Sequence, residues 1–235
     1  MHKSFYTILI LIFVATAANA QRTKVENQPK YDKARIHFGF SLGINKADFR
    51  VRKSPDLFQF DSLYNVDNLK QTGFNLGIVM NLRMGEHFDL RFIPDLAFVE
   101  RDLEYTFYLN GKQQKPSTLK KIESTFLDFP LYVKFKSERV GNFRAYVLAG
   151  GQYSIDMVSQ AKVENEDKQF VKLKKKDYGY TIGVGLDFYL EMFKFSPEFK
   201  MYNGLDNLLV PDNTIFARSL SGLNSKIFMV SLLFE

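Results

Sequence analysis

The chain has 235 residues, of which 46% are hydrophobic, and its 32 Lys and Arg against 26 Asp and Glu give a formal net charge of +6. Its one sustained apolar run lies near the N-terminus, which excludes a helical membrane protein with several spans of about 20 apolar residues each. The 24 Phe and 12 Tyr exclude a disordered chain, and the absence of Cys excludes a disulfide scaffold, a zinc–thiolate site and a cysteine nucleophile. A soluble globular chain and a β-barrel both fit this composition.

Residues 1–20 are expected to be a secretory signal peptide that is cleaved from the mature protein. Lys3 supplies the positive start, residues 8–14 supply the apolar stretch, and Ala18-Asn19-Ala20 fits the small-x-small cleavage pattern. The absence of a Cys after the apolar stretch predicts no lipoprotein anchor. Such a signal indicates a bacterial protein outside the cytoplasm, where a basic balance concerns acidic surfaces and lipid phosphates rather than nucleic acid.

Eight later segments alternate between large apolar residues and small or polar ones. A period of two predicts a strand with one apolar face, and about ten residues is the length with which a tilted strand crosses a bilayer. In chain order, the segments span residues 36–45, 74–83, 88–98, 127–135, 143–157, 178–188, 193–201 and 228–234. Pro94, Pro130 and Pro197 fall inside three of them and are expected to mark bulges or strand ends.

The connections between these segments alternate in length. Short ones fall at 84–87, 137–142 and 190–192, and long polar ones at about 47–71, 103–120, 158–176 and 203–225. This pattern predicts an all-β fold, an eight-stranded antiparallel transmembrane β-barrel of the bacterial outer membrane with short periplasmic turns and long extracellular loops. Both termini are then periplasmic, with residues 21–34 as a periplasmic N-terminal segment and residues 35–235 as the barrel domain.

Alternation alone does not say which face points outward, and a soluble lipocalin-like barrel or a β-sandwich is the competing interpretation. The apolar face is uniformly large, whereas the other face is rich in glycine, which suits the narrow interior of an eight-stranded barrel. These glycines are Gly39, Gly43, Gly73, Gly77, Gly179, Gly183 and Gly185. We therefore expect the apolar face to contact lipid, with Tyr31, Tyr105, Tyr178 and Tyr202 as candidates for an interfacial aromatic girdle.

The face opposite the apolar one carries charges, which predicts a polar network in the lumen. Its members are Arg83 at a strand end, Asp89, Arg91, Asp95, Arg101, Asp128, Lys134, Asp187, Glu198 and Lys200. We expect a packed core of neutralising ion pairs, because side chains fill a lumen of this size. An ion path is the alternative interpretation of the same charges.

No catalytic, cofactor-binding or metal-binding residue is expected. Of the three His, His2 leaves with the signal, His87 lies in a short turn and His37 near the periplasmic end of the first strand, so no Ser/His/Asp set lies at the outer rim. Metal ligands of the Cys type and clustered His are missing. The basic residues at 172 and 174–176 form either a solvated loop or a contact for lipopolysaccharide phosphates. The expected partners include outer-membrane lipid and lipopolysaccharide and exclude nucleic acid, and the oligomeric state is left open.

Short motifs spread over nearly the whole mature chain carry a resemblance to a known family. The most specific are Asn27-Gln28-Pro29-Lys30-Tyr31-Asp32 and Phe193-Lys194-Phe195-Ser196-Pro197. Phe129-Pro130-Leu131 and residues 146–151 recur across the wider superfamily of Bacteroidetes outer-membrane barrels. Together with the ending Leu233-Phe234-Glu235, these motifs resemble the PorT (also SprT) proteins of Bacteroidetes.

The resemblance implies a role in the type IX secretion system, which exports proteins bearing a C-terminal signal domain and serves gliding motility in some species. It carries over no catalytic residue. Because an eight-stranded lumen cannot pass a folded cargo, the expected role is a non-enzymatic accessory one, through assembly of or interaction with a larger translocon whose components are the implied partners. A small-solute or ion channel and a structural outer-membrane barrel remain as alternatives, and a lipid-modifying barrel enzyme is a further one.

Overall fold

The computed structural model describes residues 26–55, 63–109, 112–113, 118–158, 171–212 and 214–235. The predicted signal peptide, residues 1–20, lies outside these ranges, as do residues 21–25 of the predicted N-terminal segment. No helix within the described ranges has the length and apolar character needed to cross a membrane.

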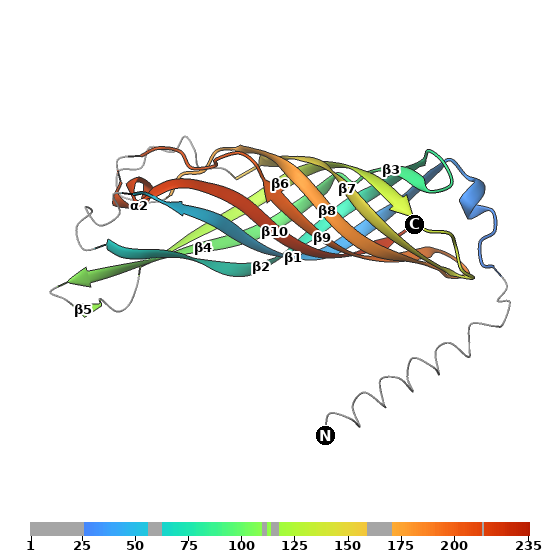
Figure 1. Ribbon diagram of the computed structural model, residues 1–235, viewed down its shortest axis with the longest axis horizontal. Helices are drawn as coiled ribbons and strands as arrows, with labels where there is room; N and C mark the ends of the chain where they lie inside the picture. Colours follow the sequence, from blue (N-terminus) through green and yellow to red (C-terminus); the bar gives the residue numbers. More distant parts are fainter. Residues whose placement is uncertain (1–25, 56–62, 110–111, 114–117, 159–170, 213) are drawn as a thin grey trace, which may run out of the picture.

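The described chain forms one closed antiparallel sheet, seen from the side in Figure 1. The strands are β1 (Ile36–Lys53), β2 (Leu63–Arg83), β3 (Phe88–Phe92), β4 (Asp95–Leu109), β5 (Lys112–Gln113), β6 (Thr118–Lys136), β7 (Phe143–Asp156), β8 (Lys176–Tyr189), β9 (Lys194–Gly204) and β10 (Leu220–Phe234), with short helices η2 (Tyr31–Lys33) and α2 (Ile215–Arg218). Strand β10 pairs with β1 along most of its length and closes the barrel. Because of this closure, each of the long strands in the described part of the chain has a pairing neighbour on both sides, as a membrane-spanning sheet requires.

The ten strands make up an eight-stranded barrel, because two of them form one barrel strand and one lies outside the barrel wall. Strands β3 and β4 both pair with β2 on one side and β6 on the other, and they keep one alignment against β6, with Phe92 opposite Leu131 and Asp95 opposite Asp128. They are therefore one strand of the barrel with a break at residues 93–94. The two-residue β5 pairs only with the end of β4 and is not a strand of the barrel wall. The eight-stranded antiparallel barrel predicted from the sequence is confirmed.

The three prolines have different effects on the sheet. Pro94 separates β3 from β4, so the prediction of a strand end is confirmed there. Pro130 and Pro197 lie inside β6 and β9 without any shift of register, and the prediction of a bulge or strand end was wrong for both. Because proline lacks an N–H, each instead coincides with a gap in pairing on one side, opposite residues 93–94 for Pro130 and residues 186–187 for Pro197.

The two faces of the barrel are those that the alternation predicts. Large apolar side chains such as Phe38 and Ile78 point outward and are 62% and 61% exposed. The glycines that the sequence predicts on the polar face do lie on the inner side, where they make room for large lumen side chains: a Cβ added to Gly185 would lie 2.3 Å from the ring of Tyr146. An apolar exterior around a polar, side-chain-filled interior is the arrangement of a barrel in lipid.

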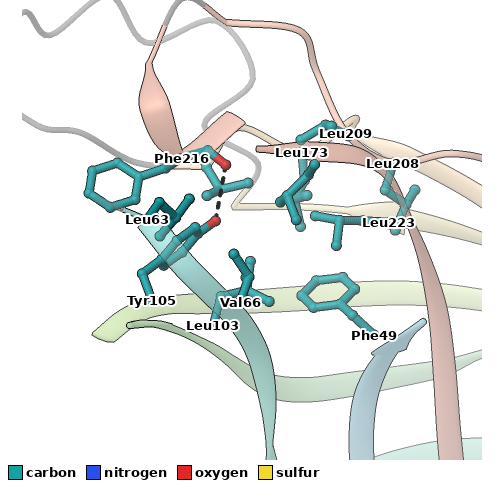
Figure 2. Packing of buried hydrophobic residues seen from close by; sticks show 12 residues of the cluster. Phe49, Leu63, Val66, Leu103, Tyr105, Leu173, Leu208, Leu209, Phe216 and Leu223 are labelled. Carbon is teal, nitrogen blue, oxygen red and sulfur yellow. Dashed lines mark hydrogen bonds between the residues drawn. The ribbon is translucent and has the colours of Figure 1, made fainter. Parts of the chain in front are cut away.

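The strands at the long-loop end of the barrel are longer than predicted, and the long loops are shorter. Strands β1, β2 and β6 have 18, 21 and 19 residues and continue through much of the sequence expected to form loops. Inside this extension lies a hydrophobic cluster, which we call the long-loop cluster (Figure 2). It contains Phe49, Leu63, Val66, Leu103, Tyr105, Val171, Leu173, Leu208, Leu209, Phe216, Leu220 and Leu223. Burial of this cluster stabilises strand pairing beyond the lipid-facing belt.

Of the four tyrosines predicted to form an aromatic girdle, Tyr178 is the one that is exposed on the outer face, and its place at the membrane interface stays a prediction. Tyr105 and Tyr202 are fully buried, because their positions alternate with outward-facing neighbours and therefore point into the lumen. The hydroxyl of Tyr105 donates to the carbonyl of Phe216 at 3.1 Å within the long-loop cluster. Tyr31 lies at the opposite end of the barrel, stacked on His37.

Candidate functional site

The half of the lumen nearer the short turns holds a polar network centred on Arg91 of β3. This side chain is fully buried, and its guanidinium group donates to the carboxylates of Glu198 and Glu235 and to the amide oxygen of Asn81. The Arg91–Glu235 distance is 3.0 Å. A guanidinium group suits this position because its planar set of donors can serve several acceptors at once.

Four lysines complete the network. Lys134 donates to both carboxylate oxygens of Asp187 at 2.8 and 3.0 Å, and Lys136 donates to Asp89 at 2.6 Å. The remaining two pair with carboxylates that Arg91 already holds: Lys194 with Glu235 and Lys200 with Glu198, each at 3.0 Å.

Neutral side chains join the same carboxylates. The hydroxyl of Tyr146 donates to Glu198 at 2.7 Å, and that of Ser196 donates to Asp187 at 2.7 Å. Each buried charge in this layer therefore has an opposite charge beside it, which offsets the cost of removing it from water. This half of the lumen is a packed polar core, and its chemistry is ion pairing within the chain.

Six residues of the network predicted from the sequence meet in this layer: Asp89, Arg91, Lys134, Asp187, Glu198 and Lys200. Asp95 and Asp128 face each other across β4 and β6 in a separate layer, where Asn75 donates to Asp95 at 3.2 Å. Arg101, also in the lumen, is fully buried and donates to the hydroxyls of Ser124 and Ser225.

Arg83 does not belong to the predicted network. It lies at the end of β2, only partly buried, and its Nε donates to the carbonyl of Gly85 at 3.2 Å in the adjoining turn. The strand ends at this residue, so its side chain reaches the rim of the barrel rather than the lumen. The expected position of Arg83 at a strand end is confirmed, but its expected place in the network of ion pairs was wrong.

Sequence reasoning missed Lys136, Lys194 and Glu235. The alternation of strand faces could have identified the two lysines. Lys136 lies on the same inward face of β6 as Lys134, and Lys194 lies on the same inward face of β9 as Glu198. Glu235 follows the last strand and has no periodicity to reveal its direction.

The segment Glu26–Ala34 lies across the mouth of the barrel at the short-turn end, and we call it the strap. The backbone N–H of Asn27 donates to the side-chain oxygen of Asn142 at 2.8 Å, and the side-chain amide of Asn27 donates to the carbonyl of Tyr189 at 3.0 Å. Gln28 donates to the carbonyl of Leu190 at 2.8 Å. The strap therefore spans two of the short turns, the one after β6 and the one after β8.

Tyr31 connects the strap to the lumen network. Its hydroxyl donates to Glu235 at 3.0 Å, its ring stacks on His37 with centroids 3.9 Å apart, and the ammonium group of Lys194 lies 4.6 Å from the ring centre. Burial and the adjacent carboxylate of Glu235 raise the pKa of Tyr31, so the hydroxyl remains a donor at all ordinary pH values.

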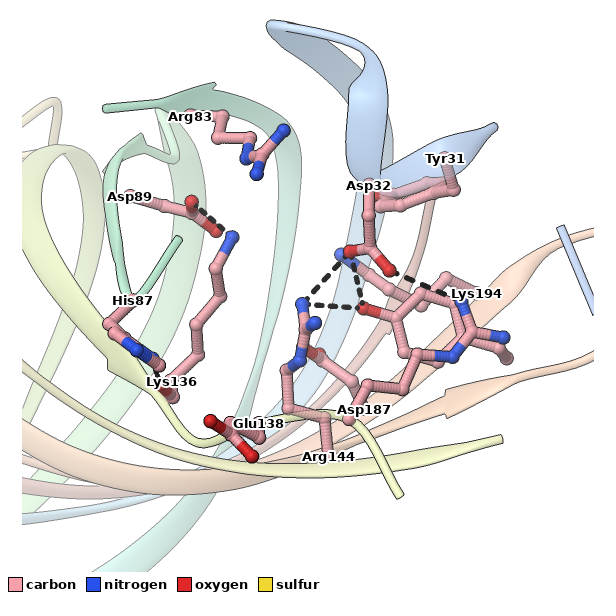
Figure 3. Close-up of polar contacts among 12 residues, drawn as sticks. Tyr31, Asp32, Arg83, His87, Asp89, Lys136, Glu138, Arg144, Asp187 and Lys194 are labelled. Carbon is pink, nitrogen blue, oxygen red and sulfur yellow. Dashed lines mark hydrogen bonds and ion pairs between the residues drawn. The ribbon is translucent and has the colours of Figure 1, made fainter. Parts of the chain in front are cut away.

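Asp32 is the ionic anchor of the strap (Figure 3). Its carboxylate accepts from Arg144 at 2.9 Å and from Arg139 at 3.2 Å, so one anion is shared by two guanidinium groups. Partial burial acts to raise the pKa of Asp32, but the two arginines outweigh it and hold this pKa below its usual value. The strap is thus held by an ion pair that persists throughout the neutral pH range.

Within the described part of the chain, no group of three or more His, Asp or Glu side chains is arranged to hold a metal ion. The charged residues of the layer around Arg91 pair with one another, and the basic loop residues Lys172 and Lys174 pair with Asp212 and Asp206 at 3.5 and 3.1 Å.

Comparison with known proteins identifies the family. Similar folds occur in solved structures of Neisserial surface protein A, NspA (11% identity, TM-score 0.44, covering 85% of this chain and 98% of that one), and of Ail, the attachment invasion locus protein of Yersinia pestis (13% identity, TM-score 0.40, 86% and 99%). OprG from Pseudomonas aeruginosa is also similar (10% identity, TM-score 0.40, 85% and 91%). No curated protein matches the sequence. A family model described as an outer membrane protein β-barrel domain matches residues 19–210, so the chain belongs to this family of outer-membrane proteins.

Proposed function

We propose that this protein is a non-enzymatic accessory barrel of the type IX secretion system, related to the PorT proteins. In this role it contributes to export of cargo proteins with a C-terminal signal, and to gliding motility where that exists, through assembly of or contact with the translocon. The observation that carries the proposal is the filled lumen: Arg91, Glu198 and Glu235 are joined across its interior and fully buried. A barrel filled in this way acts through its surface and not as a conduit.

The strap gives the proposal a second support. The motif Asn27-x-Pro29-x-Tyr31-Asp32 is among the most specific parts of the resemblance, and three of its residues make the contacts that fix the strap on the barrel. Because these residues hold the strap in place, the surface at the mouth of the barrel has a fixed shape. Such a surface suits recognition by a partner protein better than catalysis.

We further propose that the strap and the short turns face the periplasm and that the long-loop end faces outward. The supports are the difference in connection length and the predicted signal peptide, which precedes the strap. The partners would then be secretion components that reach the inner leaflet side of the outer membrane, together with the surrounding lipid and lipopolysaccharide. An epitope inserted at residues 114–117 should be detected on intact cells, whereas one inserted after residue 21 should require permeabilised cells.

Deletion of the gene tests the function directly. We expect type IX cargo to remain inside the cell while resistance to detergents and the profile of other outer-membrane proteins stay normal. Restoration by the wild-type gene, and co-purification of the protein with secretion components in mild detergent, would support the proposal. Normal cargo export in the deletion strain would overturn it.

Two further measurements separate the competing functions. Purified protein in planar bilayers should give no defined conductance, and a steady conductance that changes in an Arg91→Ala variant would favour a channel instead. Lipid A from the deletion strain should have an unchanged mass spectrum. A missing acyl or phosphate group there would favour a lipid-modifying enzyme.

A further inference from the structure

A polar cavity of about 240 Å³ lies at the short-turn mouth beside the strap. Asp32 from the strap, residues of the turn between β2 and β3, and residues of the turn between β6 and β7 line it. The lining residues are Asp32, Arg83, Glu86, His87, Lys136, Ser137, Glu138, Arg139 and Arg144. Figure 3 shows the side chains of Arg83, Lys136 and Arg144 approaching this region from different parts of the rim. The cavity is larger than the roughly 30 Å³ that one water molecule occupies in the liquid, so it can admit a small polar group.

Of the four cations that line the cavity, three have a carboxylate partner within the described part of the chain. Arg139 and Arg144 share the single carboxylate of Asp32, and Lys136 is paired with Asp89. Arg83 has no carboxylate within ion-pair distance in the described part of the chain, and its side-chain Nε donates to the carbonyl of Gly85. Guanidinium groups with free donors are the usual receptors for oxyanions.

One buried donor at the cavity has no acceptor. Arg144 is only 8% exposed, and its Nε is buried without a hydrogen-bond partner among the described residues, although its Nη1 serves Asp32 and Tyr189. A buried N–H of a charged group left unpaired costs free energy, and such a group in a native structure calls for an explanation. Arg144 lines the cavity, so an acceptor that enters it can supply the missing partner once the guanidinium group turns its Nε toward the cavity.

The rim carboxylates restrict what this acceptor can be. Glu86 and Glu138 also line the cavity, and neither has an ion-pair partner in the described part of the chain. Their negative charges oppose a multiply charged anion such as phosphate, whereas a carboxylate carries one charge and matches the planar geometry of a guanidinium group. We propose that this cavity is a binding site for a single carboxylate group, received between Arg83 and Arg144. The site is independent of the secretion role proposed above.

The carboxylate can belong to an acidic side chain or to the end of a polypeptide, and the test distinguishes the two. The full chain, labelled with ¹⁵N-arginine and held in nanodiscs of neutral lipid, is titrated with N-acetyl-aspartate amide, with N-acetyl-glycine, and with N-acetyl-asparagine amide as the uncharged match of the first. The Nε–H resonances of arginine are the readout. We expect a saturable shift of the Arg83 and Arg144 resonances with at least one carboxylate probe and none with the asparagine probe.

Variants determine whether the response belongs to the cavity. Arg83→Gln should weaken carboxylate binding about tenfold, because it removes a charged donor. Arg35→Gln is the matched control, since Arg35 lies at the same mouth, is exposed and does not line the cavity. It should change the affinity less than about twofold. Equal loss in both variants, or no saturable shift with either carboxylate, would overturn the proposal.

Inorganic phosphate is a further probe in the same titration. It should bind more weakly than the carboxylate probes to the wild-type protein, and the double variant Glu86→Gln, Glu138→Gln should remove this difference. Tighter binding of phosphate than of carboxylate by the wild-type protein would contradict the choice of ligand.

Discussion

The guanidinium group of Arg91 in β3 donates to the side-chain carboxylate of Glu235 at 3.0 Å, although the two residues are 144 positions apart in the sequence. The contact crosses the lumen and also involves Glu198 of β9 and, through Tyr31, the strap. One arginine thus connects strand β3, strand β9, the residue after β10 and the N-terminal segment. The fold therefore depends on the side-chain contacts that fill the interior of the barrel.

Replacing Arg91 should therefore be costly. In an Arg91→Met variant, Glu198 and Glu235 lose their shared partner inside the lumen, and removal of one member of a buried ion pair costs about 3–5 kcal/mol. Urea unfolding in lipid vesicles, followed by circular dichroism and by the mobility of the folded form on gels, measures the change. Lys121→Gln is the control, because Lys121 and Glu100 form a largely exposed pair at 3.5 Å whose loss should cost under about 1 kcal/mol. Unfolding of both variants at the wild-type urea concentration would show that the network does not stabilise the barrel.

Two glycines of neighbouring strands allow a test of lumen packing. Ala at position 185 would place a Cβ 2.3 Å from the ring of Tyr146, whose hydroxyl bonds Glu198, so Gly185→Ala should destabilise the barrel by about 1–3 kcal/mol. Gly151 faces outward, and the nearest atom to its added Cβ is 4.0 Å away. Gly151→Ala should be neutral or stabilising by up to about 1 kcal/mol, because glycine inside a strand costs conformational entropy. The same unfolding measurement applies, and equal effects at the two positions would contradict the assignment of inner and outer faces.

The lipid-facing belt should end before the long-loop ends of the strands. Ile182 in β8 is exposed between Tyr180 and Val184 on the outer face, and Ile182→Lys should cost about 2–4 kcal/mol if it lies near the middle of the bilayer. Leu119 is equally exposed but lies near the beginning of β6 beside Lys120 and Lys121, so Leu119→Lys should cost no more than about 1 kcal/mol. Unfolding free energies in vesicles give both values. A large cost at position 119 would mean that the belt extends into the long-loop end.

The faces of the barrel were predictable because strand alternation reports them directly. In β1, alternate positions give the two faces before any contact is known: the large apolar Ile36 and Phe38 mark the outward face, and the small Gly39 and Ser41 mark the inward face. The same alternation identified Asp89, Arg91 and Lys134 as lumen residues. The lengths of the strands were not predictable in this way, because beyond the lipid belt the strands are held by the long-loop cluster, whose members Phe49 and Leu209 come from segments far apart in the sequence.

The pairing inside the lumen could not be read from the sequence. Which carboxylate meets Arg91 depends on how the strands are aligned and on where the sheet closes, and β1–β10 closure is a contact between the two ends of the barrel sequence. The anchoring of Tyr31 and Asp32 was also beyond prediction, since residues outside the strands have no periodicity. Their motif was recognised by resemblance, and the structure supplies its physical role: attachment of the strap to the mouth.

The attachment of the strap should depend on the charge of Asp32. Asp32→Asn leaves Arg139 and Arg144 without their shared anion, so the strap should detach more often and residues 27–34 should exchange their amide protons faster at neutral pH. Asp206→Asn, which removes a partly exposed pair with Lys174 at the other end of the barrel, is the control and should leave this exchange unchanged.

Acid should have the same effect as the substitution. The pKa of Asp32 is lowered by folding from 3.8, so its contribution to strap attachment is complete above that pH and is lost as the pH falls through the lower value of the folded state. Strap resonances followed by NMR from neutral to acidic pH should therefore remain constant until below pH 3.8 in the wild-type protein. In Asp32→Asn, this acid step should be absent. A strap that detaches between pH 5 and 7, or an identical acid step in both proteins, would show that a group other than Asp32 holds it.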